Sequence, residues 1–519
     1  MTPIFNHLSQ VAPAKAAALQ DKAALVWDNE RISYAEFGDH VARVVNALVD
    51  EGVRAGDRVA FMARNTPYYY EVLLAVGTIG AVMVPVNWRL AAPEIEWIIA
   101  DSGAVLLICG DEFLSACAPL MQKLPALRTV LTLDGDYVAW RDSHDAICPP
   151  VVDGNPDDVA VQMYTSGTTG RPKGAMLTHR GLLAFRSLPP EQQPEWNRWS
   201  DDDVSLIVMP QFHIGGTGFG LQTLCAGATG LIHKEFDAGK VLSAIAQEGL
   251  SKIFTVPSAT QMLIAHPQAR STDYSRIRTL IYGASPMPLD LLREAMAVFG
   301  CGFVQQYGMT EMCGTICALV PEDHDPAGNS RMESAGRALE GVEIRIVDPK
   351  GKAQPPGVVG EIAIRSVTCM KGYWNQPEAT ADAISADGFF RSGDAGMLDR
   401  DGYLTIVDRV KDMIVSGGEN VYPAEVEAVL RSHPAIAEVA VIGVPDPKWG
   451  EAVKAVVVPL AGHRLDQAEV IGWARGQLAG YKLPKSIDLI AELPRNASGK
   501  VLRRELRAPY WEGRERAIG

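Results

Sequence analysis

The sequence predicts an α/β protein with more than one domain. Its 519 residues exceed the size at which a single hydrophobic core stops growing, so two or more domains are expected. From residue 23 to 160, and again from 205 to 282, short apolar runs alternate with helix-like segments, as in parallel sheets covered by helices. Near residue 336 the pattern changes to alternating strands separated by turns. We therefore expect a large N-terminal domain of helix-covered sheets, a small β-barrel-like subdomain, and a small α+β C-terminal domain.

Individual elements follow from the same patterns. In the first region we predict a strand at 24–27, a helix at 34–51, a strand at 58–62, a helix at 68–79, a strand at 81–86 and a helix from 92. Later strands are predicted at 159–164, 205–209, 230–232, 253–256, 279–282, 342–347, 360–365 and 402–407. The predicted domains are 1–408, with its β-rich part at about 336–408, and 412–519. Open α/β sheets bind ligands at the carboxyl ends of their strands, so the site is expected there.

Composition limits the classes of function. Hydrophobic residues make up 47% of the chain and charged residues 21%, which is typical of a soluble globular protein. The formal net charge of −14 disfavours duplex nucleic acid or an anionic membrane as a partner. The eight cysteines are sparse, and neither a zinc site nor a disulfide framework is expected. There is no long apolar run and no signal-peptide pattern, so no transmembrane segment is predicted and a cytoplasmic location is the default expectation.

The most informative segment is 164–174, which is rich in hydroxyls and glycines and contains one lysine. Glycines let backbone N–H groups approach phosphate oxygens, hydroxyls donate further hydrogen bonds, and the lysine offsets negative charge. The segment is not a Walker A motif, because its lysine precedes the last glycine and no hydroxyl follows. The predicted polyphosphate-binding residues are Thr165, Ser166, Gly167, Thr168, Thr169, Gly170 and Lys173.

Four further motifs follow this loop in order. They are Tyr307-Gly308-Met309-Thr310-Glu311, Arg391-Ser392-Gly393-Asp394, Asp408-Arg409-Val410-Lys411-Asp412 with Ser416-Gly417-Gly418-Glu419-Asn420, and Pro494-Arg495-Asn496-Ala497-Ser498-Gly499-Lys500. Together with the loop they resemble the adenylate-forming superfamily of acyl-CoA synthetases, adenylation domains and luciferases, and most of all fatty-acid or aryl-acid CoA ligases. The resemblance covers essentially the whole chain, and five ordered motifs are far more specific than any one.

The resemblance implies a site for ATP and Mg²⁺. Tyr307 offers a flat face for adenine, and Thr310 can bond the α-phosphate. Glu311 supplies a hard oxygen ligand suited to Mg²⁺, and Asp394 can accept the ribose hydroxyls. The implied nucleotide-binding residues are Gln305, Gln306, Tyr307, Thr310, Asp394, Arg409 and Lys500.

The C-terminal motifs imply a domain that moves. In the resemblance, residues 409–411 are a hinge centred on Lys411, and Lys500 contacts the carboxylate and the α-phosphate during adenylation. In a second conformation, Gly417 and Gly418 let the pantetheine thiol of CoA pass close to the backbone, although a plain turn also explains these glycines. The arginine-rich segment 503–507 is expected to be a solvated helix face.

The acyl pocket is less clear. The segment 210–218 resembles the part of fatty- and aryl-acid ligases that lines the acyl site, and its histidine is expected to contact the acyl group or gate the thiol path; a structural histidine is the alternative. The glycines after it leave room for a bulky or long tail, but tight packing explains them equally well. The predicted pocket residues are His213, Ser258, Met262, Gly283, Ala284, Ser285, Gly308 and Cys313.

These expectations combine into an ATP-dependent carboxylate–CoA ligase. A fatty or aryl carboxylate attacks the α-phosphate of ATP, pyrophosphate leaves, and CoA then displaces AMP. The catalytic residues would be Lys500, Glu311 and Thr310, with Glu311 as the metal ligand. Loading of an acyl carrier protein, a luciferase-like oxygenase and a non-catalytic nucleotide-binding module are the alternatives. A homodimer is left open.

Overall fold

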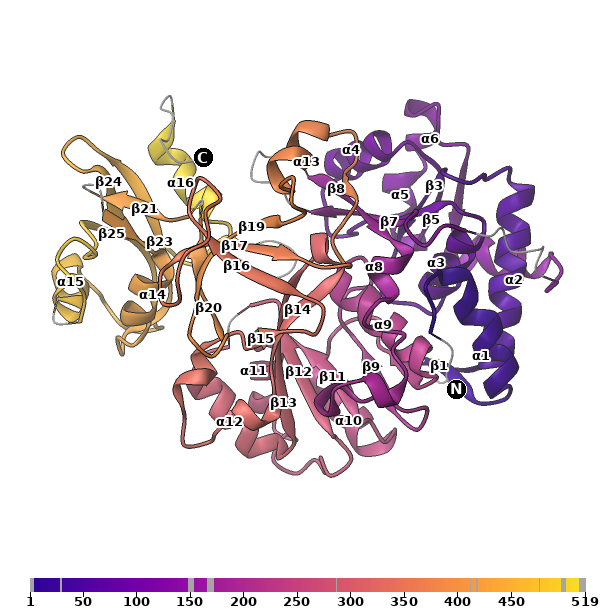
Figure 1. Cartoon of the computed structure of the whole chain (residues 1–519), viewed down its shortest axis with the longest axis horizontal. Coiled ribbons are helices and arrows are strands. Elements are labelled where there is room, and N and C mark those ends of the chain that lie inside the picture. Colours follow the sequence, from indigo (N-terminus) through magenta and orange to yellow (C-terminus); the bar gives the residue numbers. More distant parts are fainter. Residues whose placement is uncertain are drawn as a thin grey trace. The chain divides into compact units, whose positions relative to one another are not determined.

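The computed structural model describes residues 4–28, 30–147, 154–165, 172–285, 287–410, 412–416, 419–475, 477–495 and 501–512. It contains two compact units (Figure 1). The first comprises 1–343 with 365–390, and the second comprises 344–364 with 391–519. The hinge predicted at 409–411 concerns motion and stays a prediction. No helix in the described ranges is long and apolar enough to cross a membrane.

The first unit contains a nine-stranded sheet, mostly parallel. Its strands are, in spatial order, β15 (Arg337–Ala338), β14 (Gly314–Leu319), β13 (Gly302–Met309), β12 (Thr279–Gly283), β11 (Lys252–Thr255), β9 (Val204–Ile207), β10 (Thr229–Ile232), β1 (Ala23–Trp27) and β2 (Glu30–Ser33). Strands β1, β10, β9, β11, β12 and β13 are parallel, and β2, β14 and β15 join antiparallel. The carboxyl ends of the parallel strands therefore meet at one edge, as the sequence predicted.

A seven-stranded sheet completes the first unit. Its strands are β18 (Gly372–Tyr373), β8 (Lys173–Thr178), β7 (Val159–Thr165), β4 (Val82–Pro85), β3 (Arg58–Met62), β5 (Ala104–Cys109) and β6 (Thr129–Thr132). The central strands are parallel, whereas β7 and β8 form an antiparallel hairpin around the predicted phosphate loop. Strands β3 and β4 are nearly fully buried, which explains their continuous apolar runs.

Helices connect and cover these strands. In the first unit they are α1 (Val11–Leu19), α2 (Tyr34–Asp50), α3 (Tyr68–Thr78), α4 (Ala92–Ser102), α5 (Leu114–Cys117), α6 (Leu120–Lys123), α7 (Val138–Asp142), α8 (His179–Leu183), α9 (Ile214–Ala226), α10 (Ala238–Gln247), α11 (Pro257–Ala265), α12 (Leu289–Phe299) and α13 (Pro377–Ala383). Helix α2 begins where its sequence predicts, because Ser33 and Glu36 form a capping box.

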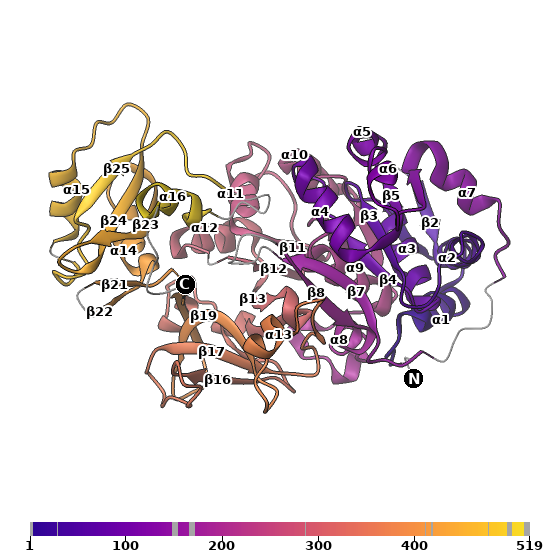
Figure 2. The same cartoon turned by 90° about the horizontal axis from the view of Figure 1, so that it is seen from above.

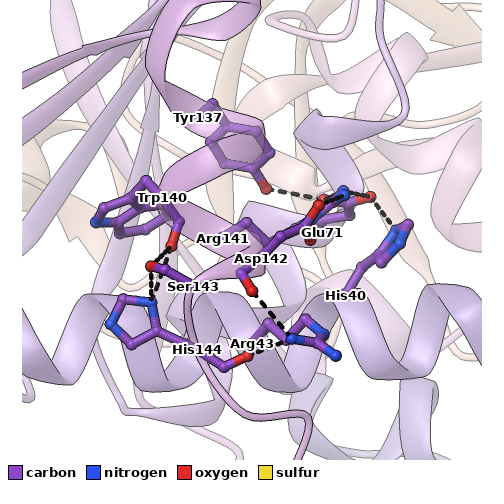
Figure 3. Close-up of polar contacts among 9 residues, drawn as sticks. All are labelled: His40, Arg43, Glu71, Tyr137, Trp140, Arg141, Asp142, Ser143 and His144. Atoms are coloured by element: carbon purple, nitrogen blue, oxygen red, sulfur yellow. Dashed lines mark hydrogen bonds and ion pairs between the residues drawn. The ribbon is translucent and has the colours of Figure 1, made fainter.

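A buried ion network fastens residues 137–141 to helices α2 and α3 (Figure 3). Glu71 on α3 is fully buried and lies 2.9 Å from His40 Nδ1 on α2. It also accepts hydrogen bonds from Tyr137 Oη at 2.9 Å and Arg141 Nη1 at 3.2 Å. Burial alone would raise the pKa of Glu71, but these three partners lower it on balance. The network is satisfied and structural.

The second unit contains two smaller sheets. Most residues of the first, ordered β16 (Glu343–Val347), β17 (Gly360–Arg365), β19 (Phe390–Leu398) and β20 (Leu404–Arg409), lie in this unit, and Figure 2 shows three of these strands as neighbours. In the described residues this is an open sheet with β16 and β20 at its edges, not a closed barrel. Strand β20 also continues through Asp408 and Arg409, which the sequence placed in an interruption after the strand.

The C-terminal segment has the predicted α+β character. Its sheet comprises β22 (Glu419–Val421), β21 (Ile414–Ser416), β24 (Gly450–Pro459), β23 (Ile436–Asp446) and β25 (Ser486–Leu489). Its helices are α14 (Pro423–Arg431), α15 (Gln467–Ala474) and α16 (Arg503–Trp511). Strands β23 and β24 form a long antiparallel pair, and valines from both enter one apolar core with α14 and α15.

Candidate active site

The predicted phosphate loop starts at the carboxyl end of β7. Thr165 is the last residue of β7 and pairs across the hairpin with Lys173, the first residue of β8. Both side chains therefore stand at the base of the loop. Five predicted loop residues lie outside the described residues: Ser166, Gly167, Thr168, Thr169 and Gly170.

Two hydroxyl groups hold the Glu311 carboxylate beside this hairpin. Thr165 Oγ1 donates to Glu311 Oε1 at 3.2 Å, and Tyr373 Oη donates to the same oxygen at 3.1 Å. Lys173 Nζ lies 4.9 Å from the centre of the Tyr373 ring, so the predicted loop lysine is close to the same group. Burial and then the charge of Glu311 raise the pKa of Tyr373, which keeps its hydroxyl protonated as a donor.

Glu311 lies in a short 3₁₀ turn, Thr310–Met312, directly after β13. The turn is closed by Cys313, which has a left-handed φ of 53°, and by Gly314 with φ of 120°. A non-glycine residue in that region is held there by its surroundings. Met370 N donates to the Glu311 carbonyl at 2.7 Å, and Arg186 Nη2 donates to the Cys313 carbonyl at 2.8 Å. These two bonds fix the turn that presents Glu311.

Arg186 joins this turn to two helices. Its guanidinium donates to three carbonyls: Leu182 O at 2.7 Å, Gly218 O at 3.0 Å and Cys313 O at 2.8 Å. No carboxylate pairs with it among the described residues. Burial lowers the pKa of Arg186. The Arg186 guanidinium is therefore stabilised by hydrogen bonds to backbone carbonyls rather than by a carboxylate.

The glycines around Arg186 are explained by packing. A Cβ at Gly218 would lie 2.4 Å from the guanidinium, and one at Gly314 would lie 2.7 Å from it. On α9, a Cβ at Gly216 would lie 2.3 Å from Pro210 O, and one at Gly220 would lie 2.0 Å from Tyr70 Oη. Of the two explanations that the sequence left open for these glycines, tight packing accounts for three of those on α9.

The predicted adenine-binding residues lie along the carboxyl end of β13. Gln305 Oε1 accepts from Tyr282 Oη at 3.2 Å, and Gln306 Oε1 accepts from Thr315 Oγ1 at 2.8 Å. Tyr307 precedes a bulge in the pairing of β13 with β14 and is half-buried. Gly283 of β12 pairs with Gln306, where a Cβ would lie 2.4 Å from the Gln306 carbonyl. Gly308 likewise leaves no room for a side chain, because its Cβ would lie 1.9 Å from Gly314 O.

His213 caps the amino end of α9. Gly215 N donates to its Nδ1 at 3.2 Å, and burial lowers the pKa of the ring. A neutral ring that accepts at Nδ1 carries its proton on Nε2, so His213 keeps one donor for another group. Capping the helix is a structural role, the alternative that the sequence left open for His213. The cap uses only Nδ1, so Nε2 stays free for the predicted acyl contact.

The other predicted acyl-pocket residues differ in exposure. Ser258 and Met262 share an exposed face of α11, and Met262 is 54% exposed. Ala284, which has a φ of 65°, and Ser285 are also exposed after β12. Cys313 is buried, and burial raises the pKa of its thiol to about 12. These assignments to the acyl wall stay predictions.

In the second unit, Asp394 and Arg409 form an ion pair. They face each other across β19 and β20, with Arg409 Nε 2.7 Å from Asp394 Oδ1. Glu361 supports the part of β19 directly before Asp394, because its carboxylate accepts from Arg391 Nε at 2.7 Å and from Gly393 N at 3.1 Å. Glu361 had no motif to mark it. The pair joins the two residues that the resemblance assigned to the ribose.

Several residues predicted to act in catalysis and thiol passage belong to the C-terminal part of the chain. Lys411, Gly417, Gly418 and Lys500 lie outside the described residues. The segment 503–507 was expected to be a solvated helix face, and for Arg503 this is wrong. The side chain of Arg503 is 17% exposed and donates to both carboxylate oxygens of Glu427 at 2.8 Å. Asp412 lies 3.5 Å from Arg503 and 3.1 Å from Arg507, so these arginines fasten α16 to its own unit.

The donor set near Glu311 suits one Mg²⁺ bound together with ATP. Magnesium is typically held by one or two carboxylates plus substrate phosphates. Glu311 Oε1 is occupied by two hydroxyl donors, and the carboxylate has a second oxygen. No cluster of three or more acidic, histidine or cysteine ligands occurs in the described ranges. Glu311 is the residue that would hold it.

Comparison with known proteins decides the family. A model of AMP-binding enzymes matches residues 13–374, and a model of the AMP-binding enzyme C-terminal domain matches residues 425–500. The chain belongs to the AMP-binding enzyme family. It is 44% identical to a feruloyl-CoA synthase of Amycolatopsis sp over 500 residues, which cover 96% of this chain and 98% of that protein. It is 40% identical to the fatty acid–[acyl-carrier-protein] ligase ScoC of Streptomyces coeruleorubidus over 518 residues, 99% of each chain.

A solved structure agrees with this assignment. ATP-bound MatB from Rhodopseudomonas palustris superposes with a TM-score of 0.89 and 33% identity, covering 97% of this chain and 99% of that one. As an AMP-binding enzyme of this type, the chain is an AMP-forming acid–thiol ligase that uses ATP, Mg²⁺ and CoA. Sequence reasoning missed Tyr373, Arg186 and Glu361. Each is a common residue type outside the motifs, and only its position in the fold gives it a role.

Proposed function

We propose that this acid–CoA ligase acts on a compact aromatic carboxylic acid rather than on a long-chain fatty acid. The observation that carries the proposal is a layer of aromatic side chains packed against the middle of β12 and the first half of β13. Trp196, Phe219 and Phe254 pack there against Ile281, Val304 and Ala318. We call these three aromatic residues the aromatic layer.

The aromatic layer limits the depth available to an acyl tail. Ile281 and Val304 lie on the same strands as Gly283 and Gln305, only one or two residues before them. The Phe219 and Phe254 ring centres are 6.0 Å apart, and a Cβ at Gly215 would lie 3.0 Å from Phe254 Cε1. A long alkyl chain would have to displace this packing, at a cost that a short aromatic acid avoids.

The names of the relatives do not decide between an aromatic and a fatty acid. The feruloyl-CoA synthase is named for an aromatic acid, and ScoC is named for a fatty acid and a carrier protein. Identity is slightly higher to the first, whereas coverage is higher to the second. Names alone therefore leave both acids open, and the aromatic layer favours the compact one.

The reaction proceeds by two displacements. The substrate carboxylate attacks the α-phosphate of ATP, pyrophosphate leaves, and the thiolate of CoA then attacks the acyl carbon while AMP leaves. When bound, Mg²⁺ neutralises phosphate charge. In our proposal Thr165 and Tyr373 orient Glu311, Thr310 donates to the α-phosphate, and Asp394 with Arg409 holds the ribose. The resemblance assigns to Lys500 the positive charge that offsets the two anions as they approach.

A panel of acids tests the substrate proposal. Pyrophosphate release with ATP and CoA would be measured for ferulate, cinnamate and benzoate, and for octanoate, dodecanoate and palmitate. We expect kcat/KM to be highest for an aromatic acid. A higher kcat/KM for dodecanoate or palmitate than for every aromatic acid would overturn it.

The thiol acceptor is tested in the same assay. Thioester formation with free CoA would be compared with loading of a phosphopantetheinylated carrier protein, because ScoC is named for a carrier acceptor. We expect acyl-CoA to form faster.

The homodimer left open above and a cytoplasmic location also remain proposals, which light scattering and cell fractionation would test.

A further inference from the structure

A pocket of about 450 Å³ lies at the amino edge of the nine-stranded sheet. Lys252, Thr279 and Gly302 are the first residues of β11, β12 and β13, and all three line it. They lie side by side, because Lys252 pairs with Thr279 and Thr279 pairs with Gly302. Figure 1 shows these three strands as neighbours in the first unit. We call this cavity the amino-edge pocket.

Lys252 is an unusual lining residue. The residue is only 3% exposed. None of the hydrogen bonds and ion pairs between described residues involves its ammonium group, and Nζ is not among the fully enclosed nitrogen atoms without a partner, which fits its position on a pocket wall. Lys252 Nζ makes a cation–π contact with Trp199, whose ring centre lies 5.6 Å away. Burial lowers the pKa of Lys252, although the nearby Asp203 opposes this. A buried charge normally has a partner, so the ammonium is poised for an anion from outside the chain.

Asp203 does not fill that role, because its oxygens are engaged elsewhere. This fully buried carboxylate pairs with Arg278, accepts from Ser251 Oγ, and accepts from Ser200 N at 2.9 Å. Arg278 is thereby directed to Asp203 at the pocket wall. The carboxylates of Glu195 and Glu322 belong to exposed residues of the lining. Lys252 is therefore a buried lining cation whose charge Asp203 does not pair with directly.

The remaining walls suit an aromatic or apolar body. Trp196 and Trp199 both line the pocket, and Trp199 is buried. Indole faces stack readily on planar rings, and their area contributes strongly to small-molecule binding. The pocket volume lies within the range of small-ligand sites.

The amino-edge pocket is separate from the candidate active site. Strands β12 and β13 run from Thr279 and Gly302 at the pocket to Gly283 and Met309 at the other edge of the sheet, directly before the turn that holds Glu311. A strand of this length spans roughly 15 Å. Phe219 and Phe254 pack against the same cluster as Trp196, and Phe254 approaches Gly215 on α9.

We propose that the amino-edge pocket binds a small organic anion, whose anionic group accepts a hydrogen bond from Lys252 Nζ and whose planar body stacks on Trp196. The shared chemistry is a carboxylate or phosphate carried by an aromatic group. The proposal does not depend on which acid the ligase activates.

Binding would be measured by titration calorimetry on the full-length protein without ATP. The probes are benzoate, phenyl phosphate and inorganic phosphate, and the variant is Lys252→Met. Methionine has a similar length and no charge, and removal of an unpaired buried charge should not weaken the fold. Lys240→Met is the matched control, because Lys240 is an exposed lysine on α10.

We expect saturable binding of benzoate, phenyl phosphate or both, weakened at least about tenfold in Lys252→Met and unchanged in Lys240→Met. Preference between benzoate and phenyl phosphate identifies the anionic group. Trp196→Phe should preserve binding and reduce tryptophan quenching. The proposal is overturned if neither benzoate nor phenyl phosphate binds saturably. It is also overturned if Lys252→Met binds these probes as tightly as the wild type does, which is the result expected if they occupy the active site instead. Equal affinity for inorganic phosphate and phenyl phosphate would overturn the stacking on Trp196.

Discussion

The guanidinium of Arg186 binds carbonyls from three separate segments of the chain, α8, α9 and the turn after Glu311. A lone arginine between predicted elements carries no signal in the sequence. In the fold its guanidinium makes three charge-assisted hydrogen bonds, and the glycines at 218 and 314 leave room for it. The position of Glu311 therefore depends on a residue distant in sequence.

Arg186→Met tests this dependence. It would leave three buried carbonyls without their donor, so we expect a loss of about 2–4 kcal/mol in the free energy of unfolding. Acid-dependent ATP–pyrophosphate exchange should fall at least about tenfold, because the Glu311 turn loses its anchor. Arg270→Met is the control, since Arg270 is 76% exposed. An unchanged rate of pyrophosphate exchange in Arg186→Met would show that the turn at Glu311 keeps its conformation without Arg186.

Tyr373→Phe tests the hydroxyl that orients Glu311. Because a hydrogen bond to a charged group typically contributes about 1.5–3 kcal/mol, we expect kcat/KM for adenylation to fall about tenfold or more. A positioning role should also raise the Mg²⁺ concentration needed for half-maximal rate, whereas a packing role should not. Tyr481→Phe, at a residue that is 41% exposed, should change neither quantity. An unaltered Mg²⁺ requirement in Tyr373→Phe would contradict the assignment.

At the scale of elements, the aromatic layer sets the expected length of the substrate. Phe254→Ala would remove a ring between Phe219 and Gly215, so we expect kcat/KM for dodecanoate to rise relative to that for cinnamate, by about tenfold. The measurement is pyrophosphate release with both acids. Phe236→Ala removes a half-buried ring from a different cluster and should leave the ratio unchanged. A constant ratio in Phe254→Ala would mean that the acyl tail lies elsewhere.

A histidine pair, formed by His179 at the start of α8 and His7 near the amino terminus, makes stability depend on pH. His179 is fully buried and stacks on His7, with ring centres 3.7 Å apart. Burial and then the charge of His7 lower the pKa of His179 from 6.5 to about 3. Between pH 6.5 and about 3, His179 therefore binds a proton in the unfolded chain but not in the folded chain. This contribution is complete above pH 6.5 and is lost as the pH falls toward 3.

Urea unfolding between pH 5 and pH 8 measures this effect. Wild type should lose about 1 kcal/mol through His179 by pH 5.5, with further loss below. His179→Gln should be less stable at pH 8 and show a flatter pH dependence, whereas His463→Gln, at an exposed residue, should keep the wild-type slope. A variant slope equal to that of wild type would rule out His179 as the source.

Most elements were predictable because their patterns are local. Strand β3 and helix α2 begin and end within one residue of the predicted bounds, since a buried apolar run and a capping box mark them. Strand β20 was placed less well. It continues through Asp408 and Arg409 because pairing with β19 stabilises polar residues that have no strand pattern of their own.

At the scale of the whole molecule, the resemblance predicts that two conformations share one nucleotide site. Lys500→Ala tests this division, although the residue lies outside the described ranges. We expect pyrophosphate exchange to fall by about two to three orders of magnitude, because the cation between two anions is lost. Thioester formation from preformed acyl-adenylate should change far less. Lys448→Ala, at an exposed residue, is the control, and equal losses in both half-reactions would contradict the two-conformation scheme.

The sequence by itself determined the class of chemistry and the family. Five motifs place hydroxyls, glycines, carboxylates and three lysines in a fixed order, and these residue types suit ATP and its phosphates whatever surrounds them. It also determined the α/β architecture, because apolar periodicity is a local property.

Only the tertiary structure decided which residues support that chemistry. Tyr373, Arg186 and Glu361 act through contacts with residues far away in sequence. The same holds for the glycines of α9, which the fold fills with neighbouring atoms, and for Lys252, whose missing partner is evident only when its neighbours are known. Packing and burial depend on the whole chain at once, so no local pattern reveals them.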